Sequence, residues 1–240
     1  MNLAITSDVI MLWLAAGAAF LVLFLGARAI AAAVVSTGRF ANLVEAMVSF
    51  VDENIVREFL GEHGRKWFGF FASLFFFILF ANLIGKIPIP GFHSPTGAIE
   101  VTATLAVMVF VIAQVVGLVK LGPIGYFKRK FLLPAPLWVK LPGIPIMFLV
   151  LLAEPFSLCV RLFANMTAGH MVLLTFATAP MVGGVWLLNQ PHVLAKAAAV
   201  LPFGLSVILV AFELFVAFIQ AFIFTLLSAL YLSESLEEHH

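Results

Sequence analysis

Charged residues and cysteine are both scarce in this chain of 240 residues. Only 10% of the residues are charged and 63% are hydrophobic, whereas about a quarter of a typical soluble domain is charged. This composition indicates an integral membrane protein. The single cysteine, Cys159, excludes an internal disulfide and is too isolated for a metal site. We expect it to pack within an apolar helix, and the formal net charge of +1 gives no case for nucleic-acid binding.

Several functional signatures are also missing. There is no phosphate-binding loop of the G-x-x-x-x-G-K-[ST] type, so we predict that ATP hydrolysis does not reside in this chain. An intramembrane enzyme is not indicated, because the sequence shows no nucleophilic dyad, aspartate pair or metal-ligand cluster with motif support. We also predict no cofactor and no metal. No internal repeat is visible, which argues against a carrier built from inverted halves.

Long apolar runs fill most of the chain. Their continuity favours membrane-spanning helices over an outer-membrane barrel, and about 20 apolar residues are enough for one crossing. We predict an all-α integral membrane protein, a single membrane domain over residues 1–240 with about five crossing helices. The expected spans are residues 9–35, 66–86, 98–120, 145–180 and 192–233. Asp8 precedes the first run, which lacks the features of a signal peptide, so we expect a retained span.

The last two spans are longer than one perpendicular crossing requires. At 1.5 Å per residue each exceeds the apolar thickness of a bilayer, about 30 Å. Each is therefore either strongly tilted or broken into two crossings, and Pro155 and Pro202 are candidate bends.

Residues 40–60 have a different pattern, typical of an amphipathic helix on the membrane surface or against a partner. Apolar residues recur at helical spacing, with acidic and basic residues on the other side: Phe40, Leu43, Val44, Met47, Val51 and Ile55 opposite Glu45, Asp52, Glu53 and Arg57. The connection predicted over residues 120–145 contains five prolines, three glycines and five cations, with no acid. This excess predicts a cytoplasmic location for the connection and for the amphipathic helix, with the N-terminus outside and the C-terminus cytoplasmic.

Polar residues interrupt the last two spans. Arg161 shares one helical face with short side chains, whereas His170 lies about 180° away on the helical wheel. In the last span Ser206, Glu213 and Gln220 are spaced by seven and fall on one stripe. An arginine inside a membrane costs at least a few kcal/mol and by default marks an ion or substrate path. A buried histidine and glutamate on different helices can share or relay a proton.

At these residues the chain resembles subunit a of the rotary F-type ATP synthases, the membrane stator beside the rotating c ring. The resemblance rests on residues 161–166 (RLFANM) with 168–170 (AGH), and on Glu213 with residues 220–225 (QAFIFT). Residues 82–85 (NLIG) with Pro88 and the closing residues 231–233 (YLS) are also similar to that family, and the likeness runs from about Phe40 to the end. In the family the two motif-bearing helices are long and steeply tilted, which favours tilt here.

The resemblance implies proton translocation through two offset half-channels, coupled to rotation of the c ring and to ATP synthesis. It implies that Arg161 faces the ring, that Asn165 supports this surface and that Gln220 forms hydrogen bonds along it. His170 and Glu213 would line the outer half-channel, in positions where some members carry glutamate and histidine instead. The implied partners are the c ring, peripheral stalk b subunits and lipid of a bacterial plasma membrane. Residues 40–60 are the candidate stalk contact.

Structural interpretations of the same residues remain open. Arg161 could bind backbone carbonyls or Glu154, His170 could be a satisfied interior histidine, and Glu213 could pair with Lys196. Glu154, which precedes Pro155, could lie near a helix start, where a carboxylate suits the helix dipole.

Asn82 and Gln114 are expected to form interhelical hydrogen bonds. The alternative function is a proton-coupled secondary transporter.

Overall fold

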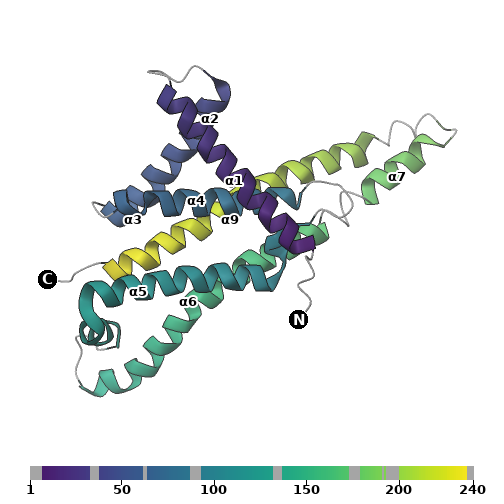
Figure 1. Cartoon of the computed structure of the whole chain (residues 1–240). Helices are drawn as coiled ribbons and strands as arrows, with labels where there is room; N and C mark the ends of the chain where they lie inside the picture. The colour runs from purple at the N-terminus through teal and green to yellow at the C-terminus, as the bar shows by residue number, and fades with distance from the viewer. Residues whose placement is uncertain are drawn as a thin grey trace, which may run out of the picture.

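The computed structural model describes residues 7–32, 38–61, 64–86, 93–131, 137–172, 179–190, 192 and 200–236. Every regular element within these ranges is a helix (Figure 1), which confirms the predicted all-α class. Within the described ranges, five helices are long and apolar enough to cross a membrane, as predicted. Their candidate spans are Val9–Arg28, Gly64–Ile84, Ile99–Lys128, Gly143–Val172 and Gly204–Leu236.

The N-terminal part contains two long apolar helices and the amphipathic segment. Helix α1 (Ser7–Ala32) crosses α4 (Gly64–Ile84) and also packs on α2 (Arg39–Val51). Helix α2 continues through the π-helical segment η1 (Asp52–Arg57) into α3 (Glu58–Leu60). Val44, Val51 and Ile55 of this segment are buried, whereas Phe40 and Leu43, expected on the same face, are exposed.

Helix α5 (Ile99–Phe131) extends beyond the predicted end of the third span. It is interrupted at Gly122, where φ is 70°, and Pro123 follows directly. A glycine tolerates this conformation and a proline lacks the backbone donor, so the helix turns at this point. The proline-rich connection that we predicted after residue 120 is therefore largely helical, because α6 (Leu137–Val172) already begins at Leu137. Similarly, α7 (Ala179–Leu188) occupies most of the connection expected at residues 180–191.

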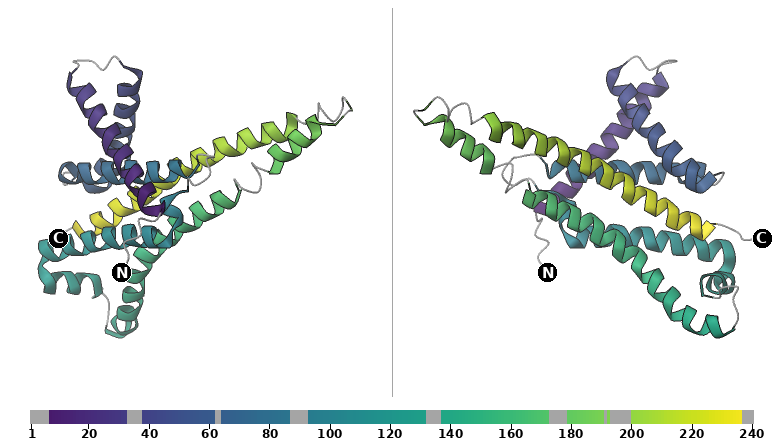
Figure 2. Two further views of the ribbon diagram at one scale, coloured as in Figure 1. Left: turned by 45° about the vertical axis from the view of Figure 1, so that its right-hand side comes forward. Right: turned by 180° about the vertical axis from the view of Figure 1, so that it is seen from behind.

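The two longest helices are α6, with 36 residues, and α9 (Val200–Leu236), with 37. Each is one helix that continues through Pro155 or Pro202, so neither segment is divided into two helices. Figure 2 shows that α7 and the N-terminal part of α9 extend away from the other helices as an arm. Helices α6 and α9 run antiparallel and contact each other.

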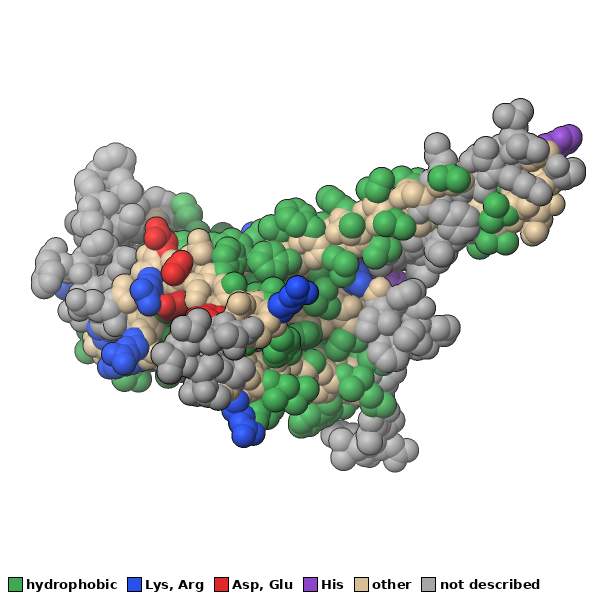
Figure 3. All heavy atoms as spheres, turned by 90° about the horizontal axis from the view of Figure 1, so that it is seen from above, with side chains coloured by type: hydrophobic (Ala, Val, Ile, Leu, Met, Phe, Trp, Pro, Cys, Tyr) green, Lys and Arg blue, Asp and Glu red, His purple; other side chains and the backbone are tan. Residues whose placement is uncertain are grey.

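The core lies where α4, α5, α6 and α9 meet. Aromatic and aliphatic side chains fill it: Phe71, Phe75, Phe76, Ile78, Leu158, Leu162 and Phe224, each at most 1% exposed. The outside is also strongly apolar, with Val119 and Ile124 at least 80% exposed. In Figure 3 the visible acidic side chains gather at one end of the molecule, while hydrophobic side chains cover the arm. An exterior of this kind matches a lipid environment.

Candidate functional site

A buried ion pair connects α9 to the end of α4. Lys86, in the turn that follows α4, donates through Nζ to Oε2 of Glu213, and each side chain is only 5% exposed. Gly169 of α6 lies against this pair, because a Cβ at that position would lie 2.6 Å from both Glu213 Oε2 and Lys86 Nζ. Glycine is therefore the residue that leaves room for the charged pair. Lys196, the partner considered from the sequence, lies outside the described residues.

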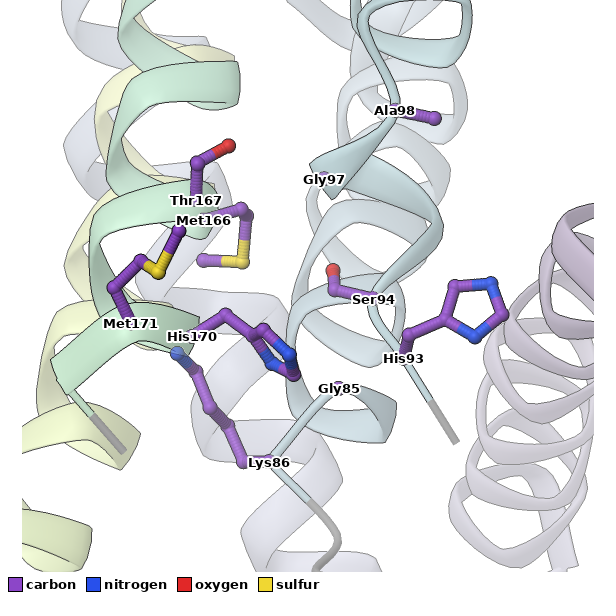
Figure 4. A pocket seen from close by; sticks show the side chains of 10 residues that line it. All are labelled: Gly85, Lys86, His93, Ser94, Gly97, Ala98, Met166, Thr167, His170 and Met171. Carbon is purple, nitrogen blue, oxygen red and sulfur yellow. The ribbon is translucent and has the colours of Figure 1, made fainter. Parts of the chain in front are cut away.

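A cavity of about 240 Å³ adjoins the pair and is lined by residues that include Lys86, His93, Ser94 and His170. Figure 4 shows the His170 ring and the Lys86 side chain in the same space, whereas the His93 ring turns toward α1. The His170 side chain is exposed in this chain. Because Gly169 directly precedes His170, the structure brings His170 and Glu213 to one region. We call Lys86, His170 and Glu213 the Glu213 cluster.

A second group of polar residues, the Glu154 cluster, surrounds the other end of the α6–α9 contact. Lys130 Nζ lies 3.7 Å from Glu154 Oε1. Tyr231 of α9 is close enough to Glu154, Arg161 and Glu234 to interact with them electrostatically. The cluster comprises Lys130, Glu154, Tyr231 and Glu234. Glu154 lies in the middle of α6, so our interpretation of it as a carboxylate near a helix start is wrong.

Arg161 lies on α6 between the two clusters, seven residues after Glu154 and eight before Gly169. It is exposed, as are Ser157, Ala164 and Ala168 at helical spacing around it. The opposite face, which includes Leu158 and Leu162, is buried. Among the described residues, no hydrogen bond or ion pair holds Arg161, and Glu154 pairs with Lys130 instead. A structural Arg161–Glu154 pair is therefore absent from this part of the chain.

Two amide side chains, one on α6 and one on α9, carry buried nitrogen atoms without hydrogen-bond partners among the described residues. They are Asn165 Nδ2 on α6 and Gln220 Nε2 on α9. Gln220 shares a buried stripe of α9 with Ser206 and Glu213, as their seven-residue spacing predicted. Buried amide groups that lack a protein partner commonly bind water.

Of the two interhelical hydrogen bonds predicted from the sequence, the one from Asn82 is present, whereas Gln114 bonds within its own helix. Asn82 Nδ2 of α4 donates to the Ala217 carbonyl of α9 over 3.3 Å, an interhelical bond as expected. Gln114 instead accepts from Tyr126, which follows the bend within α5 itself. Cys159 lies 3.6 Å from the Thr102 hydroxyl and is partly buried among apolar residues. The described residues contain no group of three or more potential ligands that could hold a metal ion.

Sequence reasoning missed Lys86, Lys130 and Gly169. Lys86 is 127 positions from Glu213, and no periodicity connects two residues so far apart. The available signal was that Lys86 is an isolated cation immediately after an apolar span, which requires a partner if it is buried.

Comparison with known proteins identifies the group to which this arrangement belongs. The family model described as "ATP synthase A chain" matches residues 9–233, and thus includes Arg161, the Glu213 cluster and every member of the Glu154 cluster except Glu234. The chain belongs to the ATP synthase A chain family. This finding confirms the resemblance inferred from the motifs around Arg161 and Glu213.

Individual relatives within this ATP synthase family align over nearly the whole chain. "ATP synthase subunit a" of Myxococcus xanthus is 38% identical over 100% of this chain and 75% of its own length. The protein of the same name from Magnetococcus marinus is 37% identical over 99% of this chain and 86% of its own. Because the described part of the chain contains five helices that are long and apolar enough to cross a membrane, this family member is a multi-pass membrane protein and a subunit of ATP synthase.

Proposed function

We propose that this subunit conducts protons through two offset half-channels at the interface with a rotating c ring, and so couples the proton gradient to rotation and ATP synthesis. A proton enters through the Glu213 cluster, reaches a carboxylate of the ring and is carried around by rotation. It leaves through the Glu154 cluster on the other side of the membrane. The nucleotide chemistry resides in other subunits of the complex.

The placement of Arg161 between two polar clusters is the observation that supports this proposal most strongly. Glu154 and Gly169 mark the clusters on α6 and are 15 residues apart, which corresponds to about 22 Å along a helix. This separation is less than the apolar thickness of a bilayer, about 30 Å. Two short polar half-channels, each reaching part of the way, therefore fit the membrane better than one continuous pore.

Arg161 is suited to act as the barrier between the two half-channels. Its exposed guanidinium lies on a strip of short side chains, formed by Ser157, Ala164 and Ala168, so another helix can approach it closely. An arginine remains charged at all physiological pH values. It attracts a deprotonated carboxylate on the ring and repels a proton that would cross directly between the clusters.

The proton uptake path consists of the cavity beside His170 and the stripe of α9 that carries Glu213. The cavity gives the His170 ring room for water, and the two ring nitrogens of an imidazole can donate and accept hydrogen bonds. The unpartnered amide nitrogens of Asn165 and Gln220 provide further donors for water along the same interface.

We also propose a stalk contact and an orientation in the membrane. A peripheral stalk of b subunits is needed to prevent the subunit from turning with the ring, and α2 offers the exposed apolar residues Phe40 and Leu43 for this contact. We place the subunit in a bacterial plasma membrane, among its lipids, with the N-terminus outside and the C-terminus in the cytoplasm. Cross-linking from a Leu43→Cys variant should capture a b subunit, and labelling by lipid alone would contradict the stalk contact.

The decisive experiment compares wild type with Arg161→Ala in vesicles that hold the assembled complex. We expect loss of ATP-driven proton pumping, and a passive proton leak once the catalytic head is removed. Arg65→Ala is the control, because Arg65 is exposed at the start of α4. Normal coupled pumping by Arg161→Ala would overturn the barrier role. Solute uptake by the isolated chain in liposomes would instead support a proton-coupled secondary transporter.

A further inference from the structure

Lys86 is placed opposite Glu213 by the register of two antiparallel helices. Asn82 of α4 bonds to Ala217 of α9, and Lys86 follows Asn82 by four residues while Glu213 precedes Ala217 by four. Because the helices are antiparallel, Lys86 and Glu213 both lie about one helical turn from this bond in the same direction, which brings the ammonium and the carboxylate together. The turn itself is closed by a backbone bond from Lys86 N to the Leu83 carbonyl, 3.0 Å long.

The ion pair with Lys86 neutralises the buried charge of Glu213. Glu213 is 4% exposed within a long apolar helix, and an unpaired charge at such a site costs several kcal/mol. Lys86 supplies the opposite charge at the same depth. Since an ammonium has three donors, binding to Glu213 leaves donors for groups in the adjoining cavity. Gly169 keeps both charged groups close to the helix that carries His170.

We propose that Lys86 is a positioning residue for proton uptake, which holds the Glu213 carboxylate next to the cavity that Lys86 and His170 line, and balances its charge. This inference rests on the proposed function, because it assigns Lys86 to the uptake path already described. The pair keeps the Glu213 carboxylate in one orientation next to the cavity. Without the ammonium, the carboxylate loses both its counter-charge and its anchor.

The test uses ATP-driven proton pumping by the assembled complex in vesicles, with four single variants. Lys86→Met keeps a long unbranched side chain and removes its charge, and we expect pumping to fall about tenfold or more. Lys86→Arg keeps the charge and should retain most of the wild-type rate. Lys66→Met is the matched control, because Lys66 is exposed at the other end of the same helix. Glu213→Gln reports on the proposed function itself.

The outcomes distinguish a failure of the proposed uptake path from a failure of the role assigned to Lys86. Normal pumping by Glu213→Gln would contradict the proposed uptake path. Loss of pumping in Glu213→Gln, together with normal pumping in Lys86→Met, would overturn only the role of Lys86. An equal loss in Lys86→Arg and Lys86→Met would also overturn it, since the charge would then not be what matters.

Failure of assembly is an informative outcome as well. If Lys86→Met prevents assembly, the double variant Lys86→Met/Glu213→Gln removes both charges at once. Restored assembly would show that the unbalanced Glu213 charge caused the defect, in support of the proposal. Continued failure would show that Lys86 serves only packing, and would overturn it.

Discussion

Asn82 on α4 and Ala217 on α9 are joined by a hydrogen bond that crosses the buried contact between these helices. The side-chain carbonyl of Asn82 also accepts a bond from Thr96, 2.7 Å away, so the amide is used from both sides. Asn82 and Thr96 are fully buried. This polar link fixes α4 against α9 at the register that places Lys86 next to Glu213.

Replacing Asn82 with leucine should destabilise the subunit by about 1–3 kcal/mol, because the Ala217 carbonyl and the Thr96 hydroxyl each lose a buried partner. Thermal unfolding of the purified complex in detergent measures the effect. Asn54→Ala is the control, since Asn54 makes only a local, exposed bond to the Phe50 carbonyl. Equal melting of Asn82→Leu and Asn54→Ala would show that the link contributes nothing.

Gly169→Ala should impair proton pumping, because the added Cβ would lie 2.6 Å from both charged groups of the Lys86–Glu213 pair. The pair must move, and a displacement of about 1 Å at a functional group can reduce a rate about a hundredfold. Gly69→Ala on α4 is the matched control, since a Cβ there meets no atom within 4 Å. Wild-type pumping rates in both variants would contradict the close packing around Gly169.

Gly122→Ala should lower the yield of folded subunit. Gly122 has φ of 70° and ψ of 159°, a region that is essentially restricted to glycine and costs another residue about 1–3 kcal/mol. Gly125→Ala lies three residues later, and its Cβ would make only an ordinary 3.7 Å contact with Leu121. Membrane yield and thermal stability of the two variants should therefore differ. Similar values for both would mean that the bend in α5 does not depend on glycine.

Lys130 and Glu154 should show a coupling energy of about 1 kcal/mol in a double-mutant cycle, within the range for residues in contact. The two side chains are 14% and 11% exposed, so solvent screens their attraction only partly. The measurement requires Lys130→Met, Glu154→Gln and the double variant, each followed by thermal unfolding. Strictly additive effects would show that the 3.7 Å approach is not an energetic interaction.

The sequence alone determined the fold class, the candidate spans and the residues of interest in α6 and α9. Apolar length predicts a spanning helix directly, because a bilayer requires every backbone group to be bonded within the segment. The rarity of charge in these runs also singled out Arg161, His170 and Glu213. Helical spacing correctly predicted that Ser206, Glu213 and Gln220 share one buried stripe.

Helix boundaries were predicted wrongly where prolines and glycines lie within or beside a helix. The prolines and glycines after residue 120 predicted a connection, yet α5 continues to Phe131 and α6 starts at Leu137. Proline disfavours a helix interior by about 3 kcal/mol, a cost that contacts elsewhere in a folded protein can offset. Glu154 was misplaced for the same reason, since the start of α6 lies well before it.

Only the tertiary structure decided which polar groups meet. Lys86 pairs with Glu213, and Lys130 approaches Glu154, because α4, α5, α6 and α9 pack in one particular register. Helical periodicity describes the face on which a residue lies, but it contains no information about the partner across an interface. The partner is selected by packing between helices far apart in sequence, and by the high cost of leaving a buried charge unpaired.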